Sequence, residues 1–348
     1  MKILLAAHVF SPSIGGIESC SMELALAFSN LGHQVQVITQ TPSNNADDNH
    51  GIAVIRRPRR GAITRAIRWC DVYFQSNISL QTAWPLIFER KPWIVCTHTW
   101  LRNSDGTTSL LDRVKKLALR LATNIYISES IRDHVGQSGF VVPNPYNATT
   151  FRLITGIKRE RSLVFLGRLV SDKGCDLLIR SLGMLRNSGF AVPLTIIGDG
   201  PEAEPLRKLI KKEHLGGVVH LTGFLSGEAL ARELNRHQVL VVPSRWEEPF
   251  GMVALEGIAC GCIVVGSSAG GLRDAIGPCG MTFMNGDMKA LSQAIRDAIE
   301  KKDSPEVYWA KASAHLERHR AESVASRYLR IFEQAYRKSH RTAEILAN

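Results

Sequence analysis

Residues 238–256 read QVLVVPSRWEEPFGMVALE, and this stretch combines a strand, a loop and a helix. The apolar, β-branched run at its start is typical of a strand buried on both faces of a parallel sheet. Pro249 and Gly251 favour a helix that begins close to Gly251, with Glu248 in the loop before it. Glu256 then lies on an otherwise apolar helix, where a carboxylate without a partner is costly to bury. The stretch therefore predicts an α/β fold and points to a functional role for both carboxylates.

The same alternation of short β-rich runs and helical patterns covers nearly the whole chain, which predicts two doubly wound, Rossmann-like parallel sheets. A helix from Ile17 to Leu31 is expected after the first strand, and helices alone after Asp287. The expected strands are 2–7, 34–39, 52–56, 72–75, 93–97, 124–128, 140–142, 162–167, 192–198, 218–221, 238–242, 262–266 and 281–283.

The length of 348 residues favours two domains. Pro143-Asn144-Pro145 ends the apolar pattern of the first half, so we assign residues 1–150 to the first domain and 151–325 to the second, with 326–348 as a final helix. Apolar residues make up 45% and charged residues 22%, which excludes wholesale disorder and fibrous repeats. No window of about 18 apolar residues predicts a transmembrane helix.

The seven cysteines form no CxxC pair, and their odd number in apolar surroundings favours reduced thiols in a cytoplasmic protein. Cys260 and Cys262 form a lone CxC that lacks the other ligands of a closed metal site, so we predict no bound metal.

The net charge of +11 is concentrated in one place, because no acidic residue lies between Asp48 and Asp71. Such a cluster attracts an anionic membrane surface or a phosphorylated substrate, or it is simply a solvated basic loop. Nucleic acid is not expected, since no helix-turn-helix, zinc-finger or RNA-recognition signature accompanies the cluster. The arginines are Arg56, Arg57, Arg59, Arg60, Arg65 and Arg68.

Ligands of open α/β sheets bind at the carboxyl ends of strands, and three loops there share one chemistry. Gly15 and Gly16 let an anion approach a helix N-terminus, although such a pair is often only a turn. Arg168 and Lys173, five residues apart, either clamp successive phosphates or are ordinary surface charges. The third loop carries Glu248, about 12 Å from Glu256 if the segment were helical throughout. That spacing suits a sugar and a ribose on either side of a diphosphate.

In order along the chain, the motifs are Pro-x-x-Gly-Gly-Ile-Glu at 12–18, Gly-Arg-Leu-x-x-x-Lys-Gly at 167–174, Ile-Gly-Asp-Gly-Pro at 197–201, Pro-Ser-x-x-Glu-Glu-x-Phe-Gly at 243–251 and Leu-Glu at 255–256. This order resembles the retaining nucleotide-sugar glycosyltransferases of family 4, which have the GT-B fold. The resemblance spans nearly the whole chain and is most specific in the second half.

The resemblance implies a role for each matching residue. Arg168 and Lys173 would hold the diphosphate of a UDP- or GDP-linked sugar, Glu248 the sugar hydroxyls, and Glu256 the ribose. His98 would face the reacting sugar, and the final helix, about 325–345, would pack on the first domain. The other implied donor-binding residues are Gly15, Gly16, Gly198, Asp199, Phe224, Phe250, Gly251 and Met252.

The resemblance also implies metal-independent hexosyl transfer with no cofactor, in the synthesis of envelope polysaccharide, lipopolysaccharide or glycolipid. The first domain would bind a sugar or lipid-linked acceptor, and the protein would be cytoplasmic or peripheral on the inner face of the cytoplasmic membrane. Two alternatives remain: a cytosolic enzyme acting on a small phosphorylated acceptor, and an inactive membrane-associated scaffold. A dinucleotide oxidoreductase is disfavoured, since no G-x-G-x-x-G follows the first strand.

Overall fold

The computed structural model describes residues 1–13, 15–43, 45, 49–102, 106–300 and 304–347, with the backbone alone for Pro305 and 342–347. Ile14 in the first glycine-rich turn and Asp48 before the arginine cluster lie outside the described residues. The chain forms two compact units, and the second is inserted into the first. Unit 1 comprises Met1–Pro145 and His319–Asn348, and unit 2 comprises Tyr146–Arg318.

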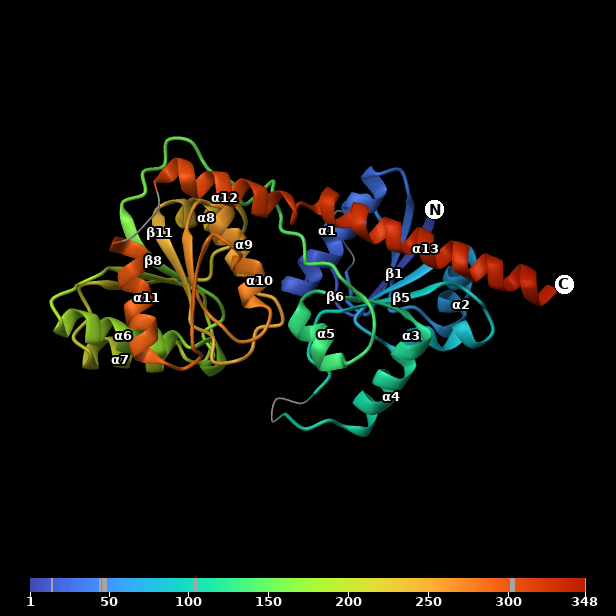
Figure 1. Cartoon of the computed structure of the whole chain (residues 1–348), viewed down its shortest axis with the longest axis horizontal. Helices are drawn as coiled ribbons and strands as arrows, with labels where there is room; N and C mark the ends of the chain where they lie inside the picture. The colour runs from blue at the N-terminus through green and yellow to red at the C-terminus, as the bar shows by residue number, and fades with distance from the viewer. Residues whose placement is uncertain (14, 44, 46–48, 103–105, 301–303, 348) are drawn as a thin grey trace. The chain divides into compact units, whose positions relative to one another are not determined.

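Unit 1 is built on a seven-stranded parallel sheet with the order β3-β2-β1-β4-β5-β6-β7. Figure 1 labels β1, β5 and β6 among its strands. Its strands are β1 (Lys2–Ala7), β2 (Gln34–Thr39), β3 (Ala53–Arg56), β4 (Val72–Ser76), β5 (Trp93–Thr97), β6 (Thr123–Tyr126) and β7 (Phe140–Val141). Its helices are α1 (Gly16–Asn30), α2 (Arg60–Trp69), α3 (Leu80–Ala83), η2 (Trp84–Ile87), α4 (Leu110–Ala118), η3 (Leu119–Leu121), α5 (Glu129–Val135) and α13 (Ala321–Ala347), where η marks a 3₁₀ helix.

Helices cover both faces of this sheet because successive strand side chains point to opposite sides. Tyr73 of β4 lies in a buried cluster with Ile67 of α2. The next residue, Phe74, packs on Phe28 of α1 and Phe332 of α13, with ring centroids 6.4 and 5.3 Å away. Helix α13 thus completes the core of unit 1 although it follows all of unit 2 in sequence.

Unit 2 has a six-stranded parallel sheet with the order β10-β9-β8-β11-β12-β13. Its strands are β8 (Arg161–Leu166), β9 (Leu194–Ile197), β10 (Val219–Gly223), β11 (His237–Val242), β12 (Ile263–Ser267) and β13 (Gly280–Phe283). Its helices are η4 (Ser171–Lys173), α6 (Cys175–Asn187), α7 (Ala203–Lys212), α8 (Gly227–Asn235), α9 (Met252–Ala259), α10 (Leu272–Ile276), α11 (Met288–Glu300) and α12 (Pro305–Glu317).

The sheet of unit 2 is also buried on both faces. Val239 and Val241 of β11 belong to a large core cluster that includes residues of α6, α7 and α11. Leu240, between them, faces α9, where a Cβ on Gly257 would lie only 2.5 Å from its side chain. This close approach of helix to strand fixes where α9 begins relative to the sheet.

The predicted α/β class and the two parallel sheets are confirmed, and every strand end lies within two residues of its predicted position. The helix expected at 17–31 runs from Gly16 to Asn30. The units divide after Pro145 and after Arg318, rather than at 150 and 325, because α13 already begins at Ala321. No helix in the part of the chain that the structure describes combines the length and the apolar run needed to cross a bilayer.

Candidate active site

The order of strands in unit 2 defines where a ligand fits. Strands β8 and β11 are neighbours, but the chain leaves β8 toward β9 and leaves β11 toward β12, on opposite sides. The loops that follow these two strands therefore diverge and leave a crevice at the carboxyl edge, which is where open α/β sheets bind ligands. The first loop carries Arg168 and Lys173, and the second carries Glu248.

The two loops meet through a glycine. Gly174 has a φ of +67°, and a Cβ there would lie 2.0 Å from the carbonyl oxygen of Pro243. Only a residue without a side chain tolerates both the conformation and the contact. The η4 turn, and with it Lys173, is thereby held against the end of β11.

Lys173 and Glu248 form a direct ion pair, with 2.6 Å between Nζ and Oε1. The hydroxyl of Ser244, which is buried, donates to the same carboxylate oxygen at 2.7 Å. The sequence predicts separate tasks for the lysine and the glutamate, and the bond between them appears only in the structure. Their side chains are 23% and 12% exposed, so the pair is accessible to a ligand from one side. Arg168, on the same loop, is exposed and has no partner among the described residues.

Backbone contacts hold the Glu248 loop in place. Glu248 forms a β-bridge with Gly270, and its carbonyl oxygen accepts a hydrogen bond from the backbone N–H of Gly271 at 2.7 Å. Asn285 donates from its side chain to the carbonyl oxygen of Ser244. Sequence reasoning assigned no role to Ser244 or Asn285. Ser244 lies inside the Pro-Ser motif, whereas no sequence signal identified Asn285.

Helix α9 starts directly behind the pair. Gly251 is its N-cap with a φ of +101°, and no side chain caps the helix. The first N–H groups of a helix lack intrahelical acceptors, so this end suits an anion. Phe250 is buried and anchors the turn, while Met252 is half-buried at the first helical position. A diphosphate at this end would lie close to two cationic side chains on the β8 loop.

Glu256 is one turn into α9 and half-buried. Its carboxylate makes no hydrogen bond or ion pair with any residue that the structure describes. Burial raises the pKa of Glu256 from 4.5 to about 7. A carboxylate kept without a protein partner at the cost of its own desolvation is typical of a ligand-binding group.

The remaining donor candidates of unit 2 lie at neighbouring strand ends. Gly198 directly follows β9, and a Cβ on it would collide with the carbonyl oxygen of Gly167. Asp199 is exposed and accepts a hydrogen bond from the backbone of Gly200 at 2.7 Å. Phe224, one residue past β10, is 59% exposed. The structure thus brings Gly198 and Asp199 beside the Arg168 loop and leaves the Phe224 ring open to a ligand.

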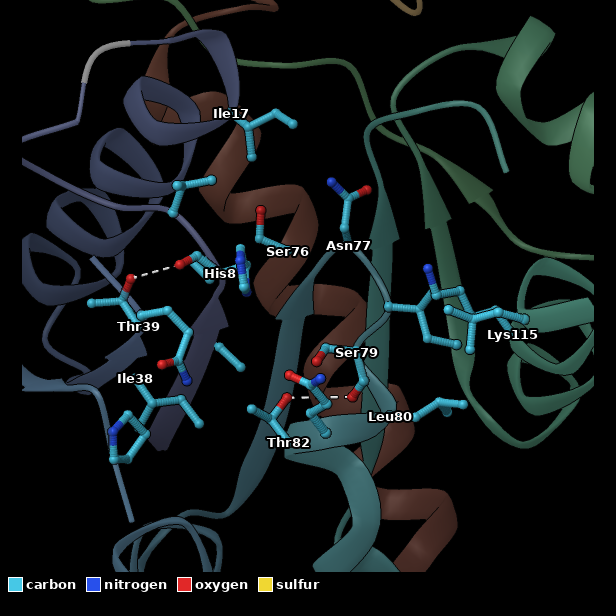
Figure 2. A pocket seen from close by; sticks show the side chains of 18 residues that line it. His8, Ile17, Ile38, Thr39, Ser76, Asn77, Ser79, Leu80, Thr82 and Lys115 are labelled. Atoms are coloured by element: carbon cyan, nitrogen blue, oxygen red, sulfur yellow. Dashed lines mark hydrogen bonds between the residues drawn. The ribbon is translucent and has the colours of Figure 1, made fainter. Parts of the chain in front are cut away.

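Unit 1 has its own crevice between β1 and β4, where the strand order reverses in the same way. A pocket of about 320 Å³ lies there, lined by the ends of both strands and by the start of α3. Figure 2 shows Ile38 and Thr39 on one side of it and Lys115 of α4 on the other. Asn77 lies between them, at the carboxyl end of β4.

His98 belongs to unit 1 and is only 3% exposed. Its backbone N–H donates to Oδ1 of Asn77 at 2.7 Å, and its buried ring lies next to the Asn144 side chain. Burial lowers the pKa of His98 to about 4, and the neighbouring Asn144 side chain offsets only part of this shift. The ring is therefore neutral at physiological pH. Asn77 has a φ of +65°, which asparagine tolerates better than most residues, and it was not identified from the sequence.

The glycines and arginines that the sequence singles out in unit 1 differ in whether other protein groups already contact them. Gly15 caps α1, and a side chain there would collide with the Glu18 carboxylate, which already lies against this helix end next to Gly16. Arg56 is half-buried, and its guanidinium donates to Ser11, Thr41 and Asn49. It ties loops together and is thus unlike the exposed residues Arg57, Arg59 and Arg60.

Comparisons with known proteins agree with this architecture. The family model for group 1 glycosyl transferases matches residues 147–315. The chain is 33% identical to a glycogen synthase of Mycobacterium tuberculosis, over 91% of this chain and 90% of that protein. It is 24% identical to the phosphatidyl-myo-inositol mannosyltransferase of Mycolicibacterium smegmatis, over 92% and 90%. The crystal structure of Anabaena HepE in complex with UDP matches with a TM-score of 0.80 and 19% identity, over 96% of this chain and 100% of that one.

Two doubly wound parallel units with this strand order have the GT-B fold, and the family model and the relative from Mycobacterium tuberculosis give the class, that of the glycosyltransferases with this fold. The identity to the relative from Mycobacterium tuberculosis extends over both units. The chain belongs to the group 1 glycosyl transferases and is a nucleotide-sugar glycosyltransferase.

Proposed function

We propose that the protein is a retaining hexosyltransferase of family 4 that moves a hexose from a nucleoside-diphosphate sugar to an acceptor hydroxyl. The observation that carries the proposal is the ion pair of Lys173 and Glu248, because the same two loops also carry the unpartnered cation of Arg168 and lead into the uncapped N-terminus of α9. The site therefore offers a binding group for each part of a sugar diphosphate. The cations and the helix N–H groups suit the phosphates, and the carboxylate suits the sugar hydroxyls.

In this proposal the donor diphosphate lies at the N-terminus of α9 and recruits Lys173, which partly releases Glu248. The freed carboxylate accepts hydrogen bonds from hydroxyls of the transferred sugar. Glu256, further along the helix, accepts hydrogen bonds from the ribose hydroxyls. These hydrogen bonds replace the ones to water that the carboxylate loses on burial. Gly198, Asp199 and Phe224 line the part of the site nearest the base.

The proposed reaction is a front-side displacement. The bond between C1 and the β-phosphate oxygen breaks, the acceptor oxygen bonds to C1 on the same face, and the acceptor proton moves to a donor phosphate oxygen. Arg168, Lys173 and the helix N-terminus neutralise the charge of the departing diphosphate. The neutral imidazole of His98 helps to orient the sugar by accepting one hydrogen bond from it. Since these groups supply the positive charge, we expect transfer to continue in the presence of a chelator.

The relatives support a UDP- or GDP-linked donor. HepE has been crystallised with UDP and with UDP-glucose. A relative in Mycolicibacterium smegmatis, 30% identical over 45% of this chain, is named a GDP-mannose-dependent phosphatidylinositol monomannoside mannosyltransferase. We expect the side chains near Phe224 to select between the two bases.

On the acceptor side, we propose that unit 1 binds a sugar or lipid-linked acceptor of cell-envelope polysaccharide, lipopolysaccharide or glycolipid synthesis. The pocket between β1 and β4 has a volume that fits a sugar, and polar side chains such as Thr39, Asn77 and Thr82 lie among the apolar ones that line it. We place the protein in the cytoplasm, peripheral to the cytoplasmic membrane. The alternative is a small phosphorylated acceptor, whose phosphate Lys115 in the pocket would bind. An inactive scaffold is the alternative of another class.

The test is a panel of UDP- and GDP-sugars, read out as the thermal shift of the protein and as slow release of the nucleoside diphosphate. One donor is expected to raise the unfolding temperature and to be hydrolysed, with and without a chelator. Arg168→Ala is expected to reduce both responses, whereas Arg207→Ala, on an exposed turn of α7, serves as the matched control. Binding without any turnover would favour the scaffold, and no binding would refute the proposal.

A further inference from the structure

Helix α4 and the η3 turn after it expose a row of apolar side chains on the surface of unit 1. Leu110, Val114, Leu117 and Leu121 are 77%, 44%, 60% and 82% exposed. Their spacing of four, three and four residues places them on one face of a helix. This spacing ordinarily marks the side that packs on the core, yet here it faces solvent.

The orientation of α4 is fixed by its opposite side. Asp112 and Leu119 are buried, and they lie across the helix from the exposed row. Asp112 forms a capping box with Ser109: its backbone N–H donates to the Ser109 hydroxyl, and its carboxylate accepts from the backbone and hydroxyl of Ser109. A helix secured in this way cannot turn its apolar row inward without losing the cap and the buried Leu119.

Cations accompany the row. Arg113 and Arg120 are exposed beside it and have no ion-pair partner among the described residues. Lys115 and Lys116 follow on the same helix, while the one acidic residue, Asp112, is used by the cap. The surface is therefore both apolar and positively charged, which is the composition of helices that lie in a membrane interface.

The same helix borders the unit 1 pocket. Leu111 and Lys115 line the pocket, and so does Pro58, which stands between the exposed Arg57 and Arg59. The arginine cluster and α4 thus lie at the rim of one cavity. A partner that binds to α4 at this rim therefore lies next to the mouth of the pocket.

We propose that the face of α4 and η3 formed by Leu110, Val114, Leu117 and Leu121 docks on an anionic lipid bilayer. The four side chains enter the boundary of the acyl chains, and Arg113 and Arg120 contact lipid phosphates. A second copy of the chain is a poorer occupant, because two surfaces of the same positive sign repel each other. The inference adds to the proposed function the surface by which the enzyme reaches a lipid-linked acceptor, but it does not depend on the donor chemistry.

The first experiment measures co-sedimentation with vesicles of phosphatidylcholine mixed with phosphatidylglycerol, in the absence of any nucleotide sugar. The triple variant Leu110→Gln, Leu117→Gln, Leu121→Gln is expected to bind about tenfold or more weakly than the unaltered protein, since three leucines no longer enter the bilayer. Glutamine has nearly the helix propensity of leucine, so the helix is expected to persist. Met184→Gln with Val307→Gln, two exposed apolar positions of unit 2, is the matched control and is expected to bind normally.

A second measurement does not depend on removing side chains. All seven native cysteines are buried, so a Leu117→Cys variant carries one accessible thiol for an environment-sensitive fluorophore. Its emission is expected to shift to the blue when phosphatidylglycerol vesicles are added and to stay unchanged with phosphatidylcholine alone. The same label at Val307→Cys is expected to show no shift.

Three results would overturn the docking surface: unaltered protein that stays in the supernatant at low salt, equal binding by the triple glutamine variant, or a lipid-free dimer that the triple variant abolishes. Donor hydrolysis by the triple variant is expected to equal that of the unaltered protein. Vesicle binding without hydrolysis in either protein would refute the proposed enzyme activity while leaving the docking surface intact.

Discussion

Replacing Glu256 by glutamine is expected to stabilise the protein and to weaken donor binding. The folded protein holds the Glu256 proton up to a pKa of about 7, whereas the unfolded chain loses it near 4.5. The stability that this proton provides is therefore complete at pH 4 and is lost as the pH rises toward 7. At about 1.4 kcal/mol per pKa unit, the rise corresponds to about 3 kcal/mol, and somewhat less because the side chain keeps some contact with water.

The assay is calorimetry of the ligand-free protein at pH 4.5 and at pH 8. Glu256→Gln is expected to unfold at about the same temperature as the unaltered protein at the lower pH and about 5 °C higher, or more, at pH 8. Glu248→Gln is a suitable comparison, because that carboxylate is already paired with Lys173 and its loss is not expected to stabilise. Equal unfolding temperatures at pH 8 would refute the desolvation argument.

Donor binding provides the second half of this test. If the ionised carboxylate holds the ribose, the affinity of the unaltered protein for nucleoside diphosphate falls as the pH drops below 7, by up to about tenfold per pH unit. The glutamine variant is expected to bind at least about tenfold more weakly at pH 8 and to show no such dependence. Isothermal titration across this pH range measures both. Full affinity of the glutamine variant for nucleoside diphosphate would show that Glu256 does not bind the ribose.

Lys173→Ala and Arg168→Ala are each expected to lower kcat/KM by about 100-fold or more, as loss of a preorganised charge commonly does. Lys173→Ala is also expected to lower the unfolding temperature, because Glu248 loses its partner, whereas Arg168→Ala is expected to leave it unchanged. Steady-state kinetics measure the first effect and calorimetry the second, and equal unfolding temperatures of the two variants would contradict the role of the ion pair. Glu248→Gln is expected to reduce transfer yet retain nucleoside-diphosphate affinity, since Lys173 becomes free for phosphate, and a loss of that affinity by titration would contradict the assignment. His98→Ala is expected to reduce transfer with unchanged nucleotide affinity, and normal transfer rates would leave the histidine a structural role.

The strands could be predicted from sequence because a strand buried on both faces is a continuous apolar run, and the runs that end at Ala7 and Val242 show this clearly. Strand ends were less certain, since the last paired residue depends on the neighbouring strand. The final helix begins at Ala321, a few residues before the predicted start, because the helical pattern after Asp287 does not mark where the chain passes from unit 2 to unit 1.

The site was predictable as a set of residues but not as a network. Arg168, Lys173 and Glu248 lie in recognisable motifs, but the bond between the last two joins residues 75 positions apart and depends on β8 lying next to β11. Asn77 shows no motif, because its role follows from a left-handed backbone conformation. The apolar row of α4 does show a sequence pattern, but this pattern is that of a helix that packs on the core. Its exposed orientation appears only in the structure.

The placement of α13 has a consequence for synthesis on the ribosome. Tyr328 and Phe332 close an aromatic cluster with Phe28 and Phe74, and the Tyr328 hydroxyl donates to the Cys96 sulfur at 3.0 Å. Unit 2 is complete in the nascent chain before α13 emerges, whereas unit 1, which begins first, must wait with this cluster open. The half that is made first is thus the half that finishes last, and chaperone contact during translation is expected to fall on unit 1.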